Sequence, residues 1–203
     1  MSTAYGDKEL QGALRDRLGL LVEFSDSSWS AALPFLYASD FAEGEIVLEA
    51  GDVVAVLHFL LEGIGRYFYL TTDGREFNKS FVRPGQVLTS VSSLVNGTPS
   101  PFFIQALESC RCMSIRYKDL TELAEMHMQW NVLARKLLEQ LAIRKERREA
   151  DFLLLSASER YRSFLIEFAD VADHIPNYHI ASYLGITEVA LSRIRKKLGL
   201  IRN

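Results

Sequence analysis

The sequence predicts an α+β protein with an antiparallel β barrel of the jelly-roll type, then a long dimerisation helix, then a helix-turn-helix domain with a short or absent wing. Three observations carry this prediction. Short β-branched and aromatic runs alternate with turn residues between about residues 41 and 117. Residues 118–155 contain neither Gly nor Pro, and two short helical patterns flank Gly185. We expect domains at 1–117, 118–155 and 156–203.

The N-terminal residues read as two helices that precede the barrel. Leu10, Leu14, Leu18 and Leu21 recur at spacings of three and four, which is typical of an amphipathic helix. Ser25 or Asp26 can cap a second helix that contains Trp29, although Pro34 interrupts its pattern.

Turn signals divide the barrel segment into short strands. They are Gly51-Asp52, Glu62-Gly63, Asp73-Gly74-Arg75 and Pro84-Gly85, and the third of these is a hairpin signal. The runs between them predict strands at 46–48, 53–61, 64–70, 76–82, 87–95, 102–107 and 111–117.

The segment from 118 to 155 predicts one helix of about 35 residues, roughly 50 Å long. Its apolar stripe is expected to continue beyond its own domain, which favours a coiled-coil dimer; a lone bridging helix is the alternative. The predicted dimer residues are Trp130, Leu133, Leu137 and Leu141. The charged run from Arg144 to Glu149 mixes both signs and predicts a solvated face.

The C-terminal segment predicts a helix-turn-helix. Ser156 to Glu159 form a capping-box sequence, and Gly185 and Thr187 suit the turn and the N-cap of the last helix. The start of that helix is where base edges are read in a major groove, and cations near a duplex displace counterions. The predicted base-reading residues are Glu188, Val189, Ser192 and Arg193; the predicted phosphate contacts are Asn177, His179, Thr187, Arg195, Lys196 and Lys197.

Charge is unevenly distributed along the chain. The net charge is −3, but from Arg144 onward eleven Lys and Arg face eight Asp and Glu, a net of +3. A basic C-terminal part on an acidic body suits a small nucleic-acid-binding domain carried by a sensing or assembly domain. We see no signal peptide and no apolar run long enough to span a membrane. Cys110 and Cys112 are expected to be reduced thiols, which indicates a cytoplasmic protein.

The order of barrel, long helix and helix-turn-helix resembles the Crp/Fnr superfamily of bacterial transcription regulators over about residues 20–201. The most specific segments are Ile180 to Thr187 and Leu191 to Leu198. The resemblance implies a homodimer on a pseudo-palindromic double-stranded DNA site, with Arg193 as the reader of a guanine. It leaves contact with RNA polymerase open.

The sequence departs from the cyclic-nucleotide-binding members of that superfamily. They place a Glu on the ribose and an Arg on the cyclic phosphate, whereas the aligned positions here are Ser90 and Ser100. A hydroxyl cannot replace the charge of a guanidinium, so we expect no control by cyclic AMP. The predicted pocket is degenerate and contains Thr89, Ser90, Ser100 and Arg144. The cysteine cluster of oxygen-sensing relatives is absent, and no cofactor is predicted.

Two other functions are compatible with parts of the sequence. A metal-dependent barrel enzyme of the cupin type is faintly suggested by Gly51, His58 and Glu62, but Phe59-Leu60 stand where a second histidine is needed. A ligand-sensing module that acts through protein contacts, with a vestigial helix-turn-helix, is the second alternative. No Ser-His-Asp or Cys-His arrangement is present in the sequence pattern, so we predict no enzyme.

Overall fold

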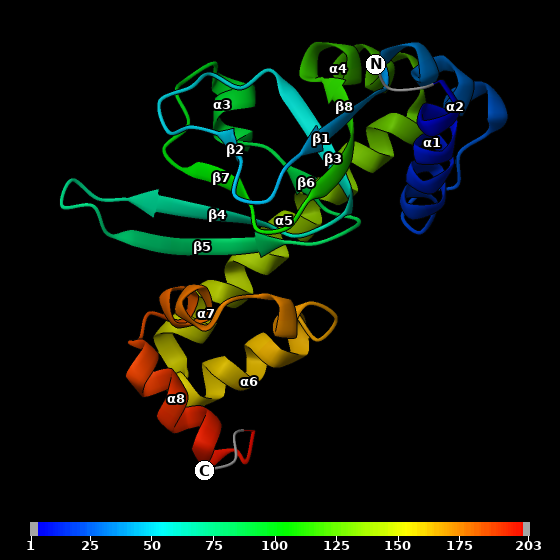
Figure 1. Cartoon of the computed structure of the whole chain (residues 1–203). Coiled ribbons are helices and arrows are strands. Elements are labelled where there is room, and N and C mark those ends of the chain that lie inside the picture. The colour runs from blue at the N-terminus through cyan, green and yellow to red at the C-terminus, as the bar shows by residue number, and fades with distance from the viewer. Residues whose placement is uncertain (1–3, 201–203) are drawn as a thin grey trace. The chain divides into compact units, whose positions relative to one another are not determined.

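The computed structural model describes residues 4–200 and divides into two compact units (Figure 1). The first comprises the chain up to Tyr67 together with Phe81–Leu141. The second comprises Phe68–Ser80 together with the chain from Ala142 onward. The tip of one hairpin therefore belongs to the same unit as the C-terminal helices. The three-domain division expected from the sequence remains a prediction.

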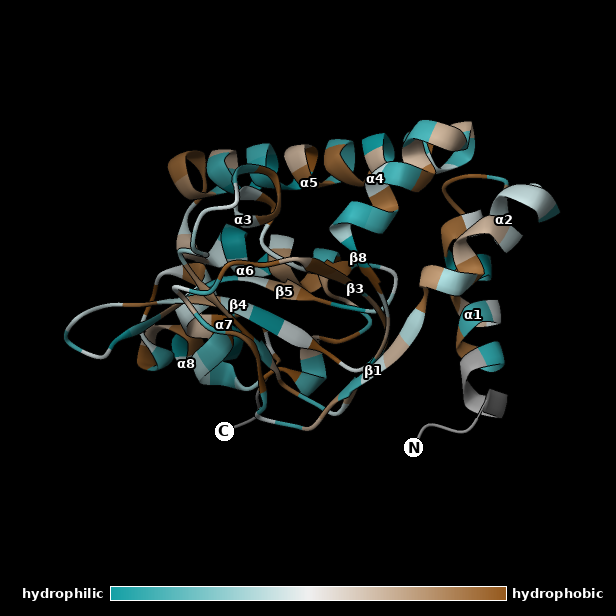
Figure 2. Ribbon diagram, turned by 90° about the horizontal axis from the view of Figure 1, so that it is seen from above, coloured by the Kyte–Doolittle hydropathy of each residue, from teal (hydrophilic) through white to brown (hydrophobic). Residues whose placement is uncertain are grey.

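The N-terminal helices pack as the leucine spacing predicts. Helix α1 spans Ala4–Gly19, α2 spans Asp26–Ala32, and a 3-10 turn η1 covers Leu33–Phe35. Leu10, Leu14 and Leu18 are buried on one side of α1, whose hydrophilic and hydrophobic residues alternate along the ribbon (Figure 2).

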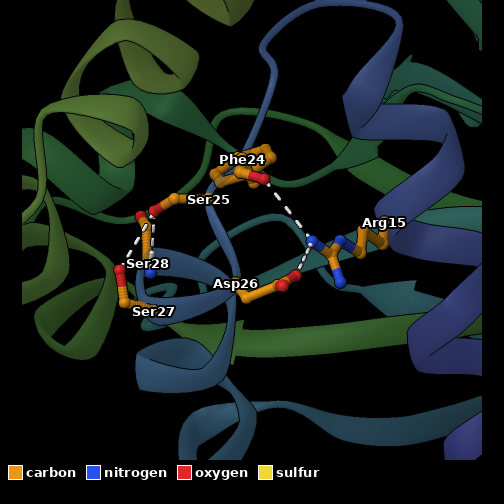
Figure 3. A network of polar contacts seen from close by, with 6 residues as sticks. All are labelled: Arg15, Phe24, Ser25, Asp26, Ser27 and Ser28. Carbon is orange, nitrogen blue, oxygen red and sulfur yellow. Dashed lines mark hydrogen bonds and ion pairs between the residues drawn. The ribbon is translucent and has the colours of Figure 1, made fainter.

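Polar contacts at the start of α2 fix the corner between the first two helices. Ser25 caps α2 by accepting the Ser28 N–H at 3.2 Å. Arg15 of α1 forms an ion pair with Asp26 at 2.6 Å (Figure 3). The same guanidinium also donates to the Phe24 carbonyl at 3.4 Å. The corner is thus held by a helix cap and by a bridge between the helices.

The barrel consists of two four-stranded sheets, ordered β1-β8-β3-β6 and β2-β7-β4-β5. The pairs β1–β8, β2–β7, β3–β6 and β3–β8 are antiparallel. The strands are β1 Tyr37–Phe41, β2 Ile46–Leu48, β3 Val56–Glu62, β4 Gly65–Leu70, β5 Glu76–Val82, β6 Val87–Leu88, β7 Phe103–Ala106 and β8 Cys110–Arg116. The expected antiparallel barrel is confirmed.

Two segments of the barrel differ from the expectation. Tyr37–Phe41 form β1, which pairs along β8, although no strand was predicted there. The predicted strand 87–95 is wrong beyond Leu88, because helix α3 occupies Val91–Asn96. Gly97, with φ of 64°, ends that helix in the left-handed region.

The single long helix that the sequence predicts is two helices. Helix α4 spans Tyr117–Met126 and α5 spans Met128–Leu154. His127 between them has an extended backbone, with φ −130° and ψ 113°. Just beyond the break, the Trp130 indole donates to the Ser28 carbonyl at 3.0 Å, so the start of α5 is anchored on α2.

The C-terminal helices match the predicted order. They are α6 Ala157–Glu167, the 3-10 turn η2 Ala172–His174, α7 Asn177–Leu184 and α8 Glu188–Lys197. Ser156 and Glu159 form the predicted capping box, and Gly185 makes the turn with φ of 68°. Between Lys197 and Leu200 the chain forms no strand, and residues 201–203 lie outside the described part. Over the described residues, no helix combines the length and apolarity needed to cross a membrane.

Candidate nucleic-acid interface

Helix α8 is held in place by a cap and by one buried side. The Thr187 hydroxyl accepts the Ala190 N–H at 3.2 Å, as the sequence predicts for an N-cap. Leu191 is buried on the inner side of α8, and Ile194 and Leu198 on the same side are half-buried. This apolar side fixes which residues of α8 face outward.

The four predicted base-reading residues share the outward side of α8. Glu188, Val189, Ser192 and Arg193 are all exposed, and Val189 keeps 62% of its surface. Their spacing of i, i+1, i+4 and i+5 places them on a single face. That face presents a carboxylate, a hydroxyl, a guanidinium and an apolar group, which together can contact base edges in a major groove.

The predicted phosphate contacts fall into two groups. Lys196 and Lys197 are exposed at the end of α8. Arg195 is half-buried and donates from Nη1 to Asn177 at the start of α7, while its Nε is buried without a hydrogen-bond partner. Thr187 is exposed, but its hydroxyl is engaged as a cap. A cavity of about 420 Å³ opens beside Arg195 and Asn177 and is also lined by Tyr161, Asp173 and His174.

His179 does not lie where a phosphate contact requires it. Its side chain is only 5% exposed. Its Nδ1 lies 3.1 Å from the side-chain amide of Asn78, which is itself 4% exposed. This buried pair of side chains replaces the expected phosphate contact of His179. The sequence held no signal for it, since the partners are 101 residues apart.

Three of the residues predicted to line a degenerate pocket in the barrel carry hydroxyl groups, and these groups bind to their own chain. Thr89 Oγ1 donates to the Val56 carbonyl at 3.0 Å, and the Ser100 hydroxyl donates to the Phe102 carbonyl at 2.9 Å. Ser90 is fully buried, with its hydroxyl 3.4 Å from that of Ser92.

The loop before β3 is hydrogen-bonded to the neighbouring serines. The Ser93 hydroxyl accepts the Val54 N–H at 2.8 Å, and the backbone of Ser100 pairs with Gly51 and Asp52 at 2.8 Å each. Arg144, the fourth predicted pocket residue, belongs to the other compact unit. The hydroxyls near β6 and α3 therefore satisfy one another and the backbone without a ligand.

The predicted dimer residues of α5 separate into two kinds. Trp130 and Leu133 have no exposed surface, and Trp130 packs against the rings of Phe24 and Trp29 at centroid distances of 4.9 and 6.0 Å. These two residues belong to the core of their own chain, which corrects their expected place in a dimer stripe. Leu137 and Leu141 are half-buried.

The reactive side chains of the barrel are in environments that suppress their reactivity. Burial raises the pKa of Cys110 to about 11 and that of Cys112 to about 12, so both thiols stay protonated. Burial lowers the pKa of His58 to about 4. Its Nδ1 lies 2.7 Å from the Ser114 hydroxyl, which in turn donates to Ser39 at 2.9 Å. Among the described residues, no group of three His, Cys, Asp or Glu side chains is placed to hold a metal ion.

Sequence reasoning missed Arg148, which was expected on a solvated face. It donates to the Tyr183 carbonyl at 2.9 Å and lies over the Tyr183 ring, 3.8 Å from the centroid. Alternating charges around Arg148 gave no sign of this contact, because its aromatic partner comes from α7.

Known proteins resemble this chain first of all in its barrel. The cyclic nucleotide-binding domain family matches residues 39–127. The potassium channel SKOR of Arabidopsis thaliana is 28% identical over 91 residues, covering 45% of this chain and 11% of the channel. The chain thus spans about a tenth of that relative's length.

Two further relatives extend the likeness beyond the barrel. The nitrogen fixation regulation protein FixK of Bradyrhizobium diazoefficiens is 28% identical over 174 residues, covering 78% of this chain and 70% of FixK. The structure of FixK2 from Bradyrhizobium japonicum superposes with a TM-score of 0.69 at 23% identity, covering 81% of this chain and 85% of that one. Residues 39–127 therefore match the cyclic nucleotide-binding domain family, and together with the helices that follow they have the fold of FixK2.

Proposed function

We propose that the protein is a homodimeric, sequence-specific DNA-binding transcription regulator that binds its operator without cyclic AMP. The observation that carries this proposal is the outward face of α8, where Glu188, Val189, Ser192 and Arg193 are exposed together. The similarity to FixK, which is named as a regulation protein, supports the same function.

Recognition would use the two kinds of contact that DNA offers. Arg193 can donate two hydrogen bonds to a guanine, and Glu188 can accept one from a cytosine amino group. Lys196 and Lys197 can neutralise phosphates and supply affinity that does not depend on sequence. Arg195 of α8 already donates to Asn177 at the start of α7, and this pair could share a phosphate.

Independence from cyclic AMP is supported by the chemistry of the barrel. Ser90 and Ser100 are buried and neutral, and the Ser100 hydroxyl already donates to the Phe102 carbonyl. A cyclic phosphate placed there would lose its hydration without gaining a cationic partner. We therefore infer that the ligand-free dimer is competent to bind DNA.

Dimerisation would use the side of α5 that its own chain leaves open. Leu138 is 53% exposed, Ala134 and Leu141 are half-buried, and the three recur at spacings of four and three. This is the spacing of a coiled-coil seam. Two copies joined along α5 would present two recognition helices, about 34 Å apart, to successive turns of the major groove.

The experiment that tests this function is enrichment of genomic DNA fragments by the purified protein without nucleotide. We expect a shared palindrome with wild type and none with Arg193→Ala. Enrichment that occurs only after cyclic AMP is added would contradict the proposed independence. No enrichment under either condition would contradict DNA reading itself.

A second measurement tests the dimer. Leu138→Glu would place a charge in the proposed seam, so light scattering should report a monomer where wild type is a dimer. Glu139→Gln, at the neighbouring exposed position, is the matched control and should remain dimeric. A dimer that survives Leu138→Glu would place the interface elsewhere.

A further inference from the structure

We propose that Arg148 is a positioning residue for operator recognition. It joins the C-terminal part of α5, strand β5 of the β4–β5 hairpin and helix α7, and so sets the spacing at which two recognition helices meet DNA. This inference rests on the proposed DNA-binding function. All of its contacts lie inside the second compact unit.

The guanidinium of Arg148 is held by aromatic rings and by carbonyl groups. It lies 3.8 Å from the centroid of Tyr183 and 4.8 Å from that of Phe152. Its Nη2 donates to the Tyr183 carbonyl at 2.9 Å and to the Asn78 carbonyl at 3.4 Å. A planar group with several donors is needed to stack and to donate in two directions, and a lysine ammonium cannot do both.

The hairpin contributes a second set of bonds to the same helix. The Asn78 N–H donates to the Ser182 hydroxyl at 2.9 Å, and that hydroxyl donates to the Glu76 carbonyl at 3.1 Å. The Asn78 side-chain amide also donates to the His179 carbonyl at 3.1 Å. Because Asn78 and His179 are nearly fully buried, losing these bonds would leave polar groups without water to replace them.

The turn at Gly185 packs against Phe152, one of the two rings that contact Arg148. A Cβ on Gly185 would lie 3.1 Å from the Phe152 ring, and the φ of 68° at Gly185 favours glycine. Only Ile186 and Thr187 separate this turn from α8. A shift of Phe152 or Arg148 is therefore passed to the start of the recognition helix over a short, constrained segment.

Two separate segments of chain thus hold α7. Helix α5 leaves this unit at Leu141, and the hairpin strands leave it at Tyr67 and Phe81. In a dimer joined along α5, the distance between the two α8 helices depends on how firmly α7 is fixed to α5. Arg148 belongs to α5 and contacts both the hairpin and α7. Its loss should therefore let the distance between the two α8 helices vary, while each α8 keeps its base-reading face.

The test measures binding to operators whose half-sites are set at the preferred spacing, or about one and two base pairs closer or farther apart. Arg148→Ala should lose about ten- to hundredfold in affinity at the preferred spacing, the size expected when a stacked cation and its hydrogen bonds are removed. Its preference among the spacings should flatten, while its affinity for a single half-site should stay within about twofold of wild type.

Three further variants make the result decisive. Arg147→Ala removes an exposed neighbouring charge and should keep the wild-type spacing profile. Asn78→Ala should flatten the profile as Arg148→Ala does. Arg148→Lys keeps the charge without the planar group, so its affinity and its spacing preference should lie between those of wild type and Arg148→Ala. If Arg148→Ala does not fold, Arg148→Lys takes its place in the test.

The outcomes separate the two proposals. An unchanged spacing profile, or an equal loss on the single half-site, would overturn the positioning role while leaving DNA recognition intact. If wild type itself binds no specific site, the proposed function fails and the positioning role fails with it.

Discussion

Helices α5 and α8 were interpreted from the same kind of pattern, and the structure gives their apolar residues different surroundings. In α8 the four residues expected to read DNA are all exposed, and Leu191 is buried on the opposite side. In α5 two of the four residues expected to contact a second copy are buried in their own chain. Phe24, just before α2, and Trp29 and the Ser28 carbonyl of α2 surround Trp130. A spacing of three and four shows which side of a helix is apolar, but it does not show what covers that side.

The largest expected effect tests the buried stripe of α5. Trp130→Ala should lower the free energy of unfolding by about 3–5 kcal/mol, because it removes a fully buried ring and leaves a cavity. Chemical denaturation would measure the loss, with the exposed Leu138→Ala as control. If Trp130→Ala weakened dimerisation and left the unfolding free energy unchanged, the contrast between the two helices would be lost.

The second-largest expected effect concerns DNA binding by the exposed face of α8. Arg193→Ala should weaken operator binding by about 1–3 kcal/mol and relax the preference at one base position. The folded domain should keep its stability, since Arg193 is exposed. Lys197→Ala is the matched variant, and it should weaken binding about equally on all sequences and reduce the salt dependence. An equal loss on every sequence for both variants would remove the distinction between base and phosphate contacts.

The same contrast between buried and exposed groups predicts a pH dependence. The pKa of His58 is lowered to about 4 by burial, against about 6.5 in an unfolded chain. The unfolded state therefore takes up a proton as pH falls below 6.5, while the folded state does so only near 4. The stability contributed by neutral His58 is complete above pH 6.5 and is lost toward pH 4.

That loss amounts to about 2 kcal/mol between pH 8 and pH 5. His58→Gln should remove this part of the pH dependence, measured as the difference between the unfolding curves of the two proteins. Parallel curves for wild type and His58→Gln would show that burial does not hold His58 neutral.

The smallest effect tests the cap of helix α8. Thr187→Ala should cost about 1 kcal/mol of stability in the C-terminal domain, because the Ala190 N–H loses its acceptor. Thr187→Ser keeps the hydroxyl and should recover most of that loss. If instead Thr187→Ala weakened DNA binding without any change in stability, and Thr187→Ser restored binding, Thr187 would act as a phosphate contact and not as a cap.

Local patterns determined much of the architecture from the sequence alone. The turn at Gly185, the cap at Thr187 and the capping box at Ser156 were all predicted, since each depends on residues within about four positions of one another. The turns between most of the strands were predicted for the same reason. The assignment of Ser90 and Ser100 to the positions of charged pocket residues also came from the sequence, and it stays a prediction.

Tertiary structure decided what no local pattern could show. His179 became a buried partner of Asn78, Trp130 became part of the core, and Arg148 became a contact between three elements. Each of these side chains meets a partner 35 to 102 residues away. The sequence specifies which groups can bond or pack, whereas the folded chain decides which of them meet, because burial and pairing depend on segments that only folding brings together.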